Sequence, residues 1–258
     1  SMTRSRIDII HVTISPCDHE RRIFNEAMTA GQQSYSVKII ALKTPELPEQ
    51  EVVNKIPLER ISIKNWKGGP FKFLSFNWKL WRTLKKYDYQ ILHVHDVWVL
   101  PGSVLVNIFR RGKVIYDAHE YIRGLEIFSL KKVSGLIWKF SERILIHGVH
   151  YLIAINEYHQ ELFINNYPQI PASGVIKNYP LFQKTEKTDQ DKQYRGREAV
   201  ILFQGILKRG RGLHQAIQAV ASLTQGSLRI IGYGELESEL KQVAGTPSIA
   251  ERIEFKGK

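Results

Sequence analysis

The sequence predicts an α/β protein made of two Rossmann-like, doubly wound domains, the second of which is incomplete. Short β-rich runs alternate with helical patterns along the chain, as in the βαβ units that build parallel sheets. A polar, charged stretch interrupts this alternation late in the chain, and a new βαβαβ pattern follows it. We therefore expect a first domain at residues 1–180, a linker or exposed loop at residues 181–197, and a partial second domain at residues 198–258.

The first domain contains apolar runs of strand length, each followed by a helical pattern. The expected strands are Ile7–Val12, Val37–Leu42, Ile56–Ile63, Gln90–His95, Lys113–Asp117 and Tyr151–Asn156. The expected helices are Glu20–Ala30, Phe73–Lys86, Pro101–Phe109, Leu130–His147 and Tyr158–Asn165. Two prolines mark Thr44–Glu51 as a loop, and an apolar face supports the long helix Leu130–His147. That face consists of Val133, Leu136, Ile137, Phe140 and Ile144.

The second domain follows the polar, charged stretch Lys184–Arg197. Its expected strands are Val200–Gln204, Leu228–Gly232 and Arg252–Phe255, and its expected helices are Gly212–Leu223 and Glu235–Val243. Three strands and two helices leave a parallel sheet with an open edge and uncovered apolar surface. We therefore expect a missing C-terminal part, an oligomer or another element to cover this edge.

Composition limits the classes of protein to which the chain can belong. Of the 258 residues, 43% are hydrophobic and 24% are charged, which is typical of a globular protein and not of a disordered one. The net charge of +12 favours contact with polyanions such as nucleotide phosphates, nucleic acid or anionic lipid. The single cysteine, Cys17, excludes an internal disulfide and suits a reducing cytoplasm. No apolar run reaches the roughly 18–20 residues that span a bilayer.

Polar side chains follow several predicted strands at the carboxyl end, where parallel sheets bind their ligands. They occur in SPCDHERR after the first strand, in HVHD and YDAHEY at the ends of two later strands, and in Asn156-Glu157. A single such residue is best interpreted as a helix cap, but several on neighbouring strands favour a common cleft. The cleft candidates are His19, Arg22, His95, Asp96 and Glu120. His119 is the candidate for contact with a reacting group, because a neutral imidazole can donate or accept a proton; Asp117 can be structural.

A basic, glycine-rich turn follows the first strand of the second domain. It runs from Gly205 to Gly212 and carries Lys208, Arg209 and Arg211. Glycines allow close backbone approach, and the N-terminus of the following helix presents free N–H groups, so the turn suits a diphosphate. It matches neither a Walker loop nor a GxGxxG fingerprint, and an exposed basic loop is the alternative. The nucleotide-binding candidates Gly232, Gly234 and Glu235 follow the next strand, where a strand-to-helix turn needs glycine in any case.

Sequence patterns for metal sites and for serine hydrolases are missing. The chain has no HExxH motif, no CxxC pair and no GxSxG elbow. We therefore expect neither a metal nor a cofactor.

The segment Lys64–Lys86 is both basic and aromatic. It holds seven Lys or Arg residues and no acidic residue. Its aromatic residues are Trp66, Phe71, Phe73, Phe76, Trp78 and Trp81. This mixture favours peripheral contact with an anionic membrane, and Tyr121–Gly148 can extend the surface. The alternatives are single-stranded nucleic acid, which stacks on such aromatic residues, and a core-facing helix with a solvated basic side.

The motifs, in this order, resemble family-four glycosyltransferases of bacterial surface-polysaccharide pathways. The resemblance rests on ERRIFNEA, ILHVHDVWVLP, VIYDAHEY, VIKNYP, FQGILKRGRGLHQAI, LRIIGYGELESELK and IEFKG. It implies a GT-B fold and a nucleotide-sugar donor whose diphosphate is held mainly by the second domain. It also implies retention at the transferred sugar, with His119 near that sugar and Arg211 on the phosphates. The hinge motif VIKNYP adds Asn178 to the cleft candidates.

The resemblance further implies a glycan or lipid-linked acceptor and a cytoplasmic enzyme, peripheral on the inner face of the membrane. Arg and Lys would stabilise the leaving diphosphate, which explains why such enzymes need no metal. Two departures matter. Cys17-Asp18-His19 replaces the glycine pair of many relatives, and the family's Glu-x7-Glu motif has no match before Lys258. We therefore expect a C-terminally truncated chain with weak or absent transfer activity.

Three other functions stay open from the sequence alone. The chain can be a non-catalytic module that binds a nucleotide or a partner, and binding without transfer would identify it. A nucleotide-sugar epimerase shares the two-domain shape but would need a carboxylate-rich cleft. Nucleic-acid binding predicts steep salt dependence, but nothing in YDAHEY favours it, so we expect no nucleic acid as partner.

Overall fold

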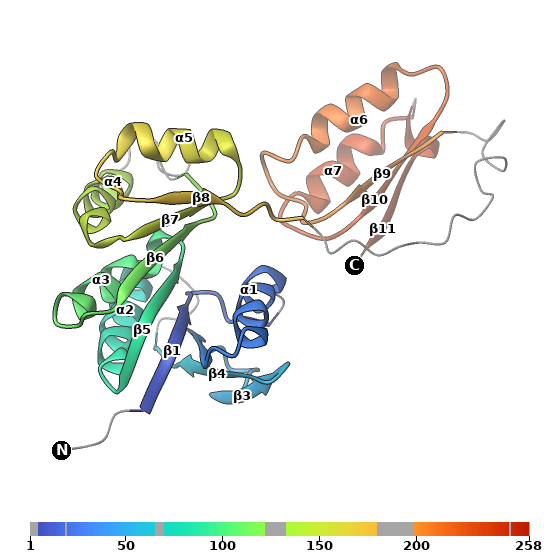
Figure 1. Cartoon of the computed structure of the whole chain (residues 1–258). Coiled ribbons are helices and arrows are strands. Elements are labelled where there is room, and N and C mark those ends of the chain that lie inside the picture. Colours follow the sequence, from blue (N-terminus) through green and yellow to red (C-terminus); the bar gives the residue numbers. More distant parts are fainter. Residues whose placement is uncertain are drawn as a thin grey trace. The chain divides into compact units, whose positions relative to one another are not determined.

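A computed structural model describes residues 5–18, 20–64, 70–121, 133–179, 199–247 and 249–257. The chain divides into two compact units, which we call unit 1 (Ser1–Leu181) and unit 2 (Phe182–Lys258). The linker predicted at residues 181–197 lies outside the described residues. Each unit is an α/β structure and is described by itself (Figure 1).

Unit 1 is built on an eight-stranded sheet with the strand order β3-β4-β2-β1-β5-β6-β7-β8. The strands are β1 (Ser5–Val12), β2 (Val37–Leu42), β3 (Gln50–Val53), β4 (Ile56–Ile61), β5 (Tyr87–His95), β6 (Lys113–Ala118), β7 (Tyr151–Ala154) and β8 (Ser173–Val175). All neighbours pair in parallel except β3 and β4, which are antiparallel. The order reverses at β1, which lies between β2 and β5, as in doubly wound folds.

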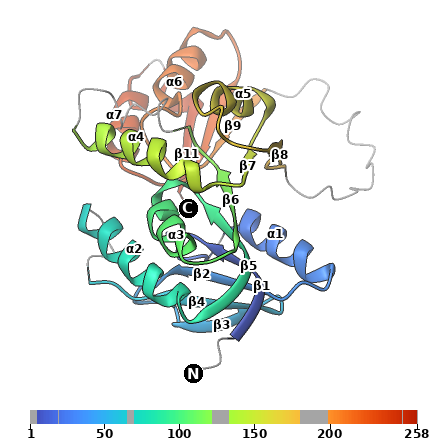
Figure 2. The same ribbon diagram turned by 60° about the vertical axis from the view of Figure 1, so that its left-hand side comes forward.

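Helices cover both faces of this sheet. They are α1 (Arg21–Gln32), α2 (Pro70–Leu84), α3 (Leu100–Ile108), α4 (Val133–Leu145) and α5 (Glu157–Asn166), with short 3₁₀ turns η1 (Val97–Val99) and η4 (Ile146–Gly148). Helix α1 lies on one face, and α2 and α3 lie on the other (Figures 1 and 2). Because side chains alternate along a strand, Ile10 packs with Phe76 on the α2 face, whereas its neighbour Ile9 packs with Ala27 on the α1 face.

Two short strands were not predicted. Strand β3 includes the end of the predicted loop Thr44–Glu51, and its alternating half-exposed pattern is too short to be recognised beside two prolines. Strand β8 has only three residues. The other predicted strands of unit 1 agree with the structure to within a few residues at each end.

Helix α4 presents its apolar side to solvent. Of the predicted apolar face, Leu136, Ile137, Phe140 and Ile144 are all exposed. The buried side instead carries Glu142, whose carboxylate accepts hydrogen bonds from the hydroxyls of Tyr116 and Tyr167. The apolar periodicity predicted the helix correctly. It did not predict which side packs on the core, because an apolar face is buried only where another element of the fold packs against it.

Unit 2 contains a three-stranded parallel sheet with the order β11-β10-β9. Its elements are β9 (Val200–Gln204), α6 (Leu213–Ser222), β10 (Ser227–Ile231), α7 (Glu237–Ala244), η6 (Ala250–Arg252) and β11 (Ile253–Gly257). Leu207, Leu213 and Leu240 belong to its apolar core. In the part of unit 2 that the structure describes, β9 and β11 are both edge strands, and Val200, Ile201 and Leu202 are exposed.

None of the helices in the described part of the chain combines the length and the apolar composition that a bilayer crossing requires.

A candidate active site at the carboxyl end of the unit 1 sheet

A cluster of polar side chains lies on the α1 face of the sheet. Val94 packs in the core on the α2 side, so its neighbours His93 and His95 point to the opposite face. Parallel pairing places His11 of β1 beside His93, and Asp117 of β6 beside His95. The spacing His-x-His, together with this register, therefore brings residues from three strands together at the carboxyl end of the sheet.

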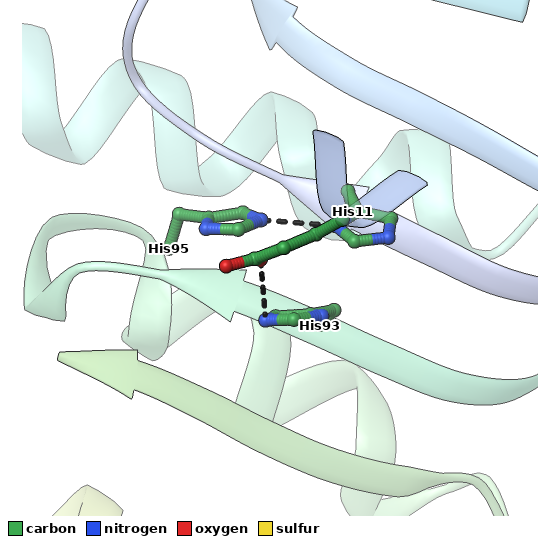
Figure 3. Close-up of side chains that lie close together, drawn as sticks. His11, His93 and His95 are labelled. Atoms are coloured by element: carbon green, nitrogen blue, oxygen red, sulfur yellow. Dashed lines mark hydrogen bonds and ion pairs between the residues drawn. The ribbon is translucent and has the colours of Figure 1, made fainter. Parts of the chain in front are cut away.

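The three histidine rings form a stack, as Figure 3 shows. The ring centroids of His11 and His93 are 4.5 Å apart, and those of His93 and His95 are also 4.5 Å apart with nearly parallel planes. All three side chains are buried. Burial, followed by the neighbouring histidines, lowers the pKa of His11 well below its usual value and that of His95 to about 3. Both rings are therefore neutral at physiological pH.

Asp117 is the hub of the cluster. Arg22 of α1 donates to it twice, from Nε at 3.1 Å and from Nη2 at 2.7 Å. Its Oδ2 also lies 3.2 Å from Nδ1 of His95 and 3.0 Å from Nε2 of His119. Burial alone would raise the pKa of Asp117, but the hydrogen bonds from the surrounding histidines outweigh it and hold the pKa well below its usual range.

The ionised carboxylate fixes the protons of the buried rings. Because a carboxylate can only accept, Nδ1 of His95 donates to Asp117 and its Nε2 is left as an acceptor. Nδ1 of His11, 3.0 Å away, then donates to that Nε2. This assignment leaves Nε2 of His11 as a bare lone pair, and that atom has no hydrogen-bond partner among the described residues.

His119 occupies the partly exposed edge of the cluster. Its Nε2 bonds to Asp117, its Nδ1 lies 3.6 Å from Oδ2 of Asp96, and 24% of its side chain is exposed. Burial lowers its pKa, but the hydrogen bond to Asp117 and the charge of Asp96 outweigh burial and raise the pKa. The carboxylates of Asp117 and Asp96 thus favour the charged form of the ring, whereas a neutral ring was expected from the sequence.

Asp96 adopts a strained backbone conformation to reach this position. Its φ of 68° is unfavourable for a residue with a side chain. Its N–H donates to the carbonyl of Asp117, and its Oδ1 accepts from the N–H of His119. Burial, only partly opposed by His119, raises the pKa of Asp96 to about 6.

The remaining predicted cleft residues are more peripheral. Glu120 and Asn178 are exposed, and His19 lies outside the described residues. Asn156, two residues after β7, accepts a hydrogen bond from the N–H of His159 and caps α5, so the helix-cap interpretation is right there. Of the predicted set, the structure therefore brings together Arg22, His95, Asp96 and His119, and adds residues that sequence reasoning missed or left as structural. These are His11, Glu26, His93 and Asp117.

The same cluster has donors of the kind that bind metals. One ring nitrogen each of His11, His93 and His95 and a carboxylate oxygen of Glu26 lie within 4.8 Å of one another. Such donors suit a divalent transition metal. The guanidinium of Arg22, 3.1 Å from Glu26, already supplies a positive charge to this carboxylate. His11 is far in sequence from His93 and His95. The only sequence signal for the cluster would have been the parallel pairing of β1 with β5, the two strands that carry these histidines.

The loop after β1 is held by a buried arginine. Arg60 of β4 donates to the carbonyls of Pro16 and Cys17 and pairs with Glu51. Cys17 has a left-handed φ of 53°, and burial raises the pKa of its thiol to about 12. The loop that replaces the glycine pair of the family is therefore fixed by Arg60, and its thiol is not nucleophilic.

The basic turn of unit 2 exposes its charged side chains, while Leu207 within it is buried in the apolar core. Lys208, Arg209 and Arg211 are all solvent-accessible, and Gly212 caps α6 in the left-handed conformation. The first amides of α6 lack intrahelical partners, as at every helix start. A side chain at Gly210 would meet nothing within 4 Å, so there is space for a ligand beside this backbone.

The second glycine turn supports the first. A Cβ at Gly232 would stand 1.8 Å from the carbonyl oxygen of Gly205, and one at Gly234 would stand 2.4 Å from that of Leu207. The N–H of Leu207 donates to the carbonyl of Tyr233 in this turn, and the carbonyl of Leu207 accepts from the N–H of Leu236. Gly232 and Gly234 therefore have a packing role whatever they bind, and Glu235 is exposed beside them.

Comparisons with solved structures show the fold. Sucrose-phosphate synthase from Thermosynechococcus elongatus superimposes with a TM-score of 0.75 at 14% identity, covering 99% of this chain and 71% of that one. The lipopolysaccharide outer core galactosyltransferase WaaB gives 0.70 at 16% identity, with 98% and 68% covered. HepE from Anabaena, in complex with UDP and glucose, gives 0.69 at 17% identity, with 97% and 69% covered. These matches confirm the predicted α/β architecture of the GT-B glycosyltransferases.

Sequence comparison gives the family. No curated protein matches the chain significantly. The model of Glycosyltransferase Family 4, however, matches residues 19–178, which is more than half of the 258 residues. The match includes Arg22, Glu26, His93, His95, Asp117 and His119 of the cluster. The chain therefore belongs to Glycosyltransferase Family 4.

Proposed function

We propose that the chain acts in the transfer of a sugar, with retention, from a nucleotide-sugar donor to a glycan or lipid-linked acceptor. The observation that carries the proposal is the placement of His119. It lies at the carboxyl end of a central parallel strand, between the carboxylates of Asp96 and Asp117, and is partly exposed while the rest of the histidine cluster is buried. An imidazole held in place at this end of the sheet suits a polar substrate.

In this proposal each unit has its own role. The turn Gly205–Gly212 binds the donor diphosphate through the amides of α6 and through Arg211, with Lys208 or Arg209 as the second base. Positive charge there stabilises the leaving nucleoside diphosphate. His119 binds the transferred sugar, and the acceptor hydroxyl attacks from the face that the diphosphate leaves, which gives retention.

A uridine donor is the first to test, because HepE structures hold UDP, UDP with glucose, and UDP-glucose. The assay uses a panel of nucleotide sugars and not UDP-glucose alone. Neither a metal nor a cofactor has a step in this mechanism.

We also propose that the enzyme works at the inner face of an anionic membrane. The support is helix α2, where Phe71, Leu74 and Trp78 are exposed beside the exposed cations Lys79 and Arg82. Trp66, in the same predicted segment, lies outside the described residues. Aromatic and basic side chains on one helix suit the boundary between headgroups and acyl chains.

The experiment is a turnover assay with a panel of nucleotide sugars, in which NMR follows the released nucleoside diphosphate and the anomer of the product. The wild-type chain is expected to turn over one donor slowly with retention, and His119→Ala to lower the rate by about 10²-fold or more. His147→Ala, which changes an exposed histidine of the same unit, is the matched control. Binding without turnover would favour a non-catalytic module, and an inverted product would contradict retention.

A further inference from the structure

A deep apolar groove lies between helices α2, α3 and α4 of unit 1. Its volume is about 670 Å³, within the roughly 300–1,000 Å³ of typical small-molecule sites. Phe73, Trp78 and Trp81 of α2, Leu105 of α3, and Ile137 and Trp138 of α4 are among the side chains that line it. The groove is on the α2 side of the sheet, whereas the histidine cluster is on the α1 side.

The groove offers a ligand few hydrogen bonds. Besides the indole N–H groups of Trp78, Trp81 and Trp138, only Asn77 and Ser141 have polar side chains among its lining residues. The amide of Asn77 is already occupied, because it donates to the carbonyls of Phe73 and Trp98 and accepts from the N–H of Gly102. A polar ligand would lose its hydrogen bonds to water without replacement, so the groove suits a hydrocarbon.

The surface around the groove is also apolar. The exposed large side chains on these helices are Phe71, Leu74, Trp78, Leu105, Ile108, Leu136, Ile137, Phe140 and Ile144, with Phe109 directly after α3. Phe109 is 79% exposed and Phe140 is 67% exposed. Large exposed apolar side chains gathered on adjacent helices indicate an interaction site on a globular protein.

Charge identifies the kind of partner. Helices α2 and α3 have no acidic residue, and the single acidic residue of α4, Glu142, is buried against Tyr116 and Tyr167. Among the described residues, the exposed basic ones on these helices or within three residues of their ends are Lys79, Arg82, Lys85, Lys86, Arg111 and Arg143. A partner for this face is therefore both anionic and rich in hydrocarbon, which describes a bilayer of anionic lipids.

We infer that the α2–α3–α4 face docks on an anionic bilayer and that one lipid hydrocarbon chain enters the groove. Nucleic acid fits less well, because the exposed aliphatic side chains Leu74, Leu105 and Ile137 beside the aromatic rings suit a hydrocarbon better than stacked bases. The inference deepens the membrane part of the proposed function by giving it a binding site, and it is independent of the sugar-transfer chemistry.

Vesicle flotation tests the docking surface. We expect the wild-type chain to bind vesicles of equal parts phosphatidylglycerol and phosphatidylcholine, and to bind pure phosphatidylcholine vesicles much less. Leu105→Glu should lower the bound fraction by about tenfold or more, because it puts a charge in the apolar site. Val52→Glu is the matched control, since it makes the same charge change at an exposed apolar residue of β3. Equal binding of the Leu105 and Val52 variants would overturn the inference.

Fluorescence quenching tests the groove itself. Lipids with bromine-labelled acyl chains should quench Trp81 and Trp138, and Ser141→Phe, which fills the groove with an apolar ring, should reduce that quenching while vesicle binding persists. Unchanged quenching in this variant would show that no chain enters the groove. Self-association that Leu105→Glu abolishes in the absence of vesicles would point to a second copy and also overturn the inference. Circular dichroism confirms that the variants are folded. Nucleotide binding is measured on the same variants, so that a failure of the membrane-docking inference can be told from a failure of the sugar-transfer proposal.

Discussion

Nε2 of His119 lies 3.0 Å from Oδ2 of Asp117, two residues earlier on the same edge of the sheet. One carboxylate thus connects the exposed imidazole to the buried part of the cluster, where it also receives two hydrogen bonds from Arg22. The relationship fixes the orientation of the His119 ring directly after β6 and raises its pKa. It also means that the pKa of the exposed ring depends on the buried carboxylate of Asp117.

The charge of His119 should respond to Asp96. Asp96→Asn removes one of the two carboxylates that face the ring and is expected to lower the pKa of His119, while Asp117, His95 and Arg22 remain around it. An NMR titration of the ring protons measures this shift. Asp88→Asn, at an exposed position of β5, is the control. A pKa of His119 that is the same in both variants would refute the assigned charge.

Asp117 should be a large contributor to stability. Asp117→Asn removes the principal partner of Arg22, whose side chain is only 9% exposed, and breaking a buried ion pair costs about 3–5 kcal/mol. Urea unfolding measures the free energy of unfolding, again with Asp88→Asn as control. A loss below about 1 kcal/mol would mean that the pair is solvated like a surface salt bridge.

The pH dependence of stability follows from the same two groups. The lowered pKa of Asp117 gives stability that is fully present above its unfolded pKa of about 3.9 and is lost as the pH falls. The raised pKa of His119 gives stability that is fully present below about 6.5 and is lost as the pH rises through its folded value. Both contributions should be much smaller in Asp117→Asn. A variant with the wild-type pH profile would contradict this account.

The loop after β1 should depend on Arg60. Arg60→Met removes hydrogen bonds to the carbonyls of Pro16, Cys17 and Pro48 and the ion pair with Glu51. Hydrogen bonds to charged groups contribute about 1.5–3 kcal/mol each, so a loss of at least about 2 kcal/mol is expected in urea unfolding. Arg21→Met, at an exposed position of α1, should change stability little. Equal effects of the two substitutions would show that Arg60 does not fix the loop.

The glycines of unit 2 should differ in their tolerance of a side chain. Gly234→Ala would place Cβ 2.4 Å from the carbonyl oxygen of Leu207, whereas Cβ at Gly210 meets nothing within 4 Å. Both positions have positive φ, 82° at Gly210 and 159° at Gly234, so each variant carries backbone strain, but only Gly234→Ala adds the close contact. Thermal unfolding followed by circular dichroism should show a clearly lower midpoint for Gly234→Ala. Equal midpoints would contradict the packing role of Gly234.

The fold was largely predictable, because alternating strands and helices and the turn residues between them are local signals. Strand Val37–Leu42, for instance, has the predicted bounds. The site was only partly predictable. His95, Asp96 and His119 follow strands and were recognised from that position, but His11, Glu26 and His93 join them through strand register and helix packing, which are non-local. The outward apolar side of α4 was unpredictable for the same reason: Glu142 faces the core because two tyrosines from other elements bind it.

The central claim is that the basic turn of unit 2 binds the diphosphate of a sugar donor, and calorimetric titration with UDP, GDP and ADP tests it most directly. The wild-type chain should bind at least one of them, and Arg211→Ala should weaken that binding about tenfold or more, since charge-assisted bonds to phosphate are strong. Arg229→Ala, an exposed arginine of β10 paired with Glu254, should bind like the wild type. No binding of any nucleotide, or the same affinity in Arg211→Ala, would contradict the account.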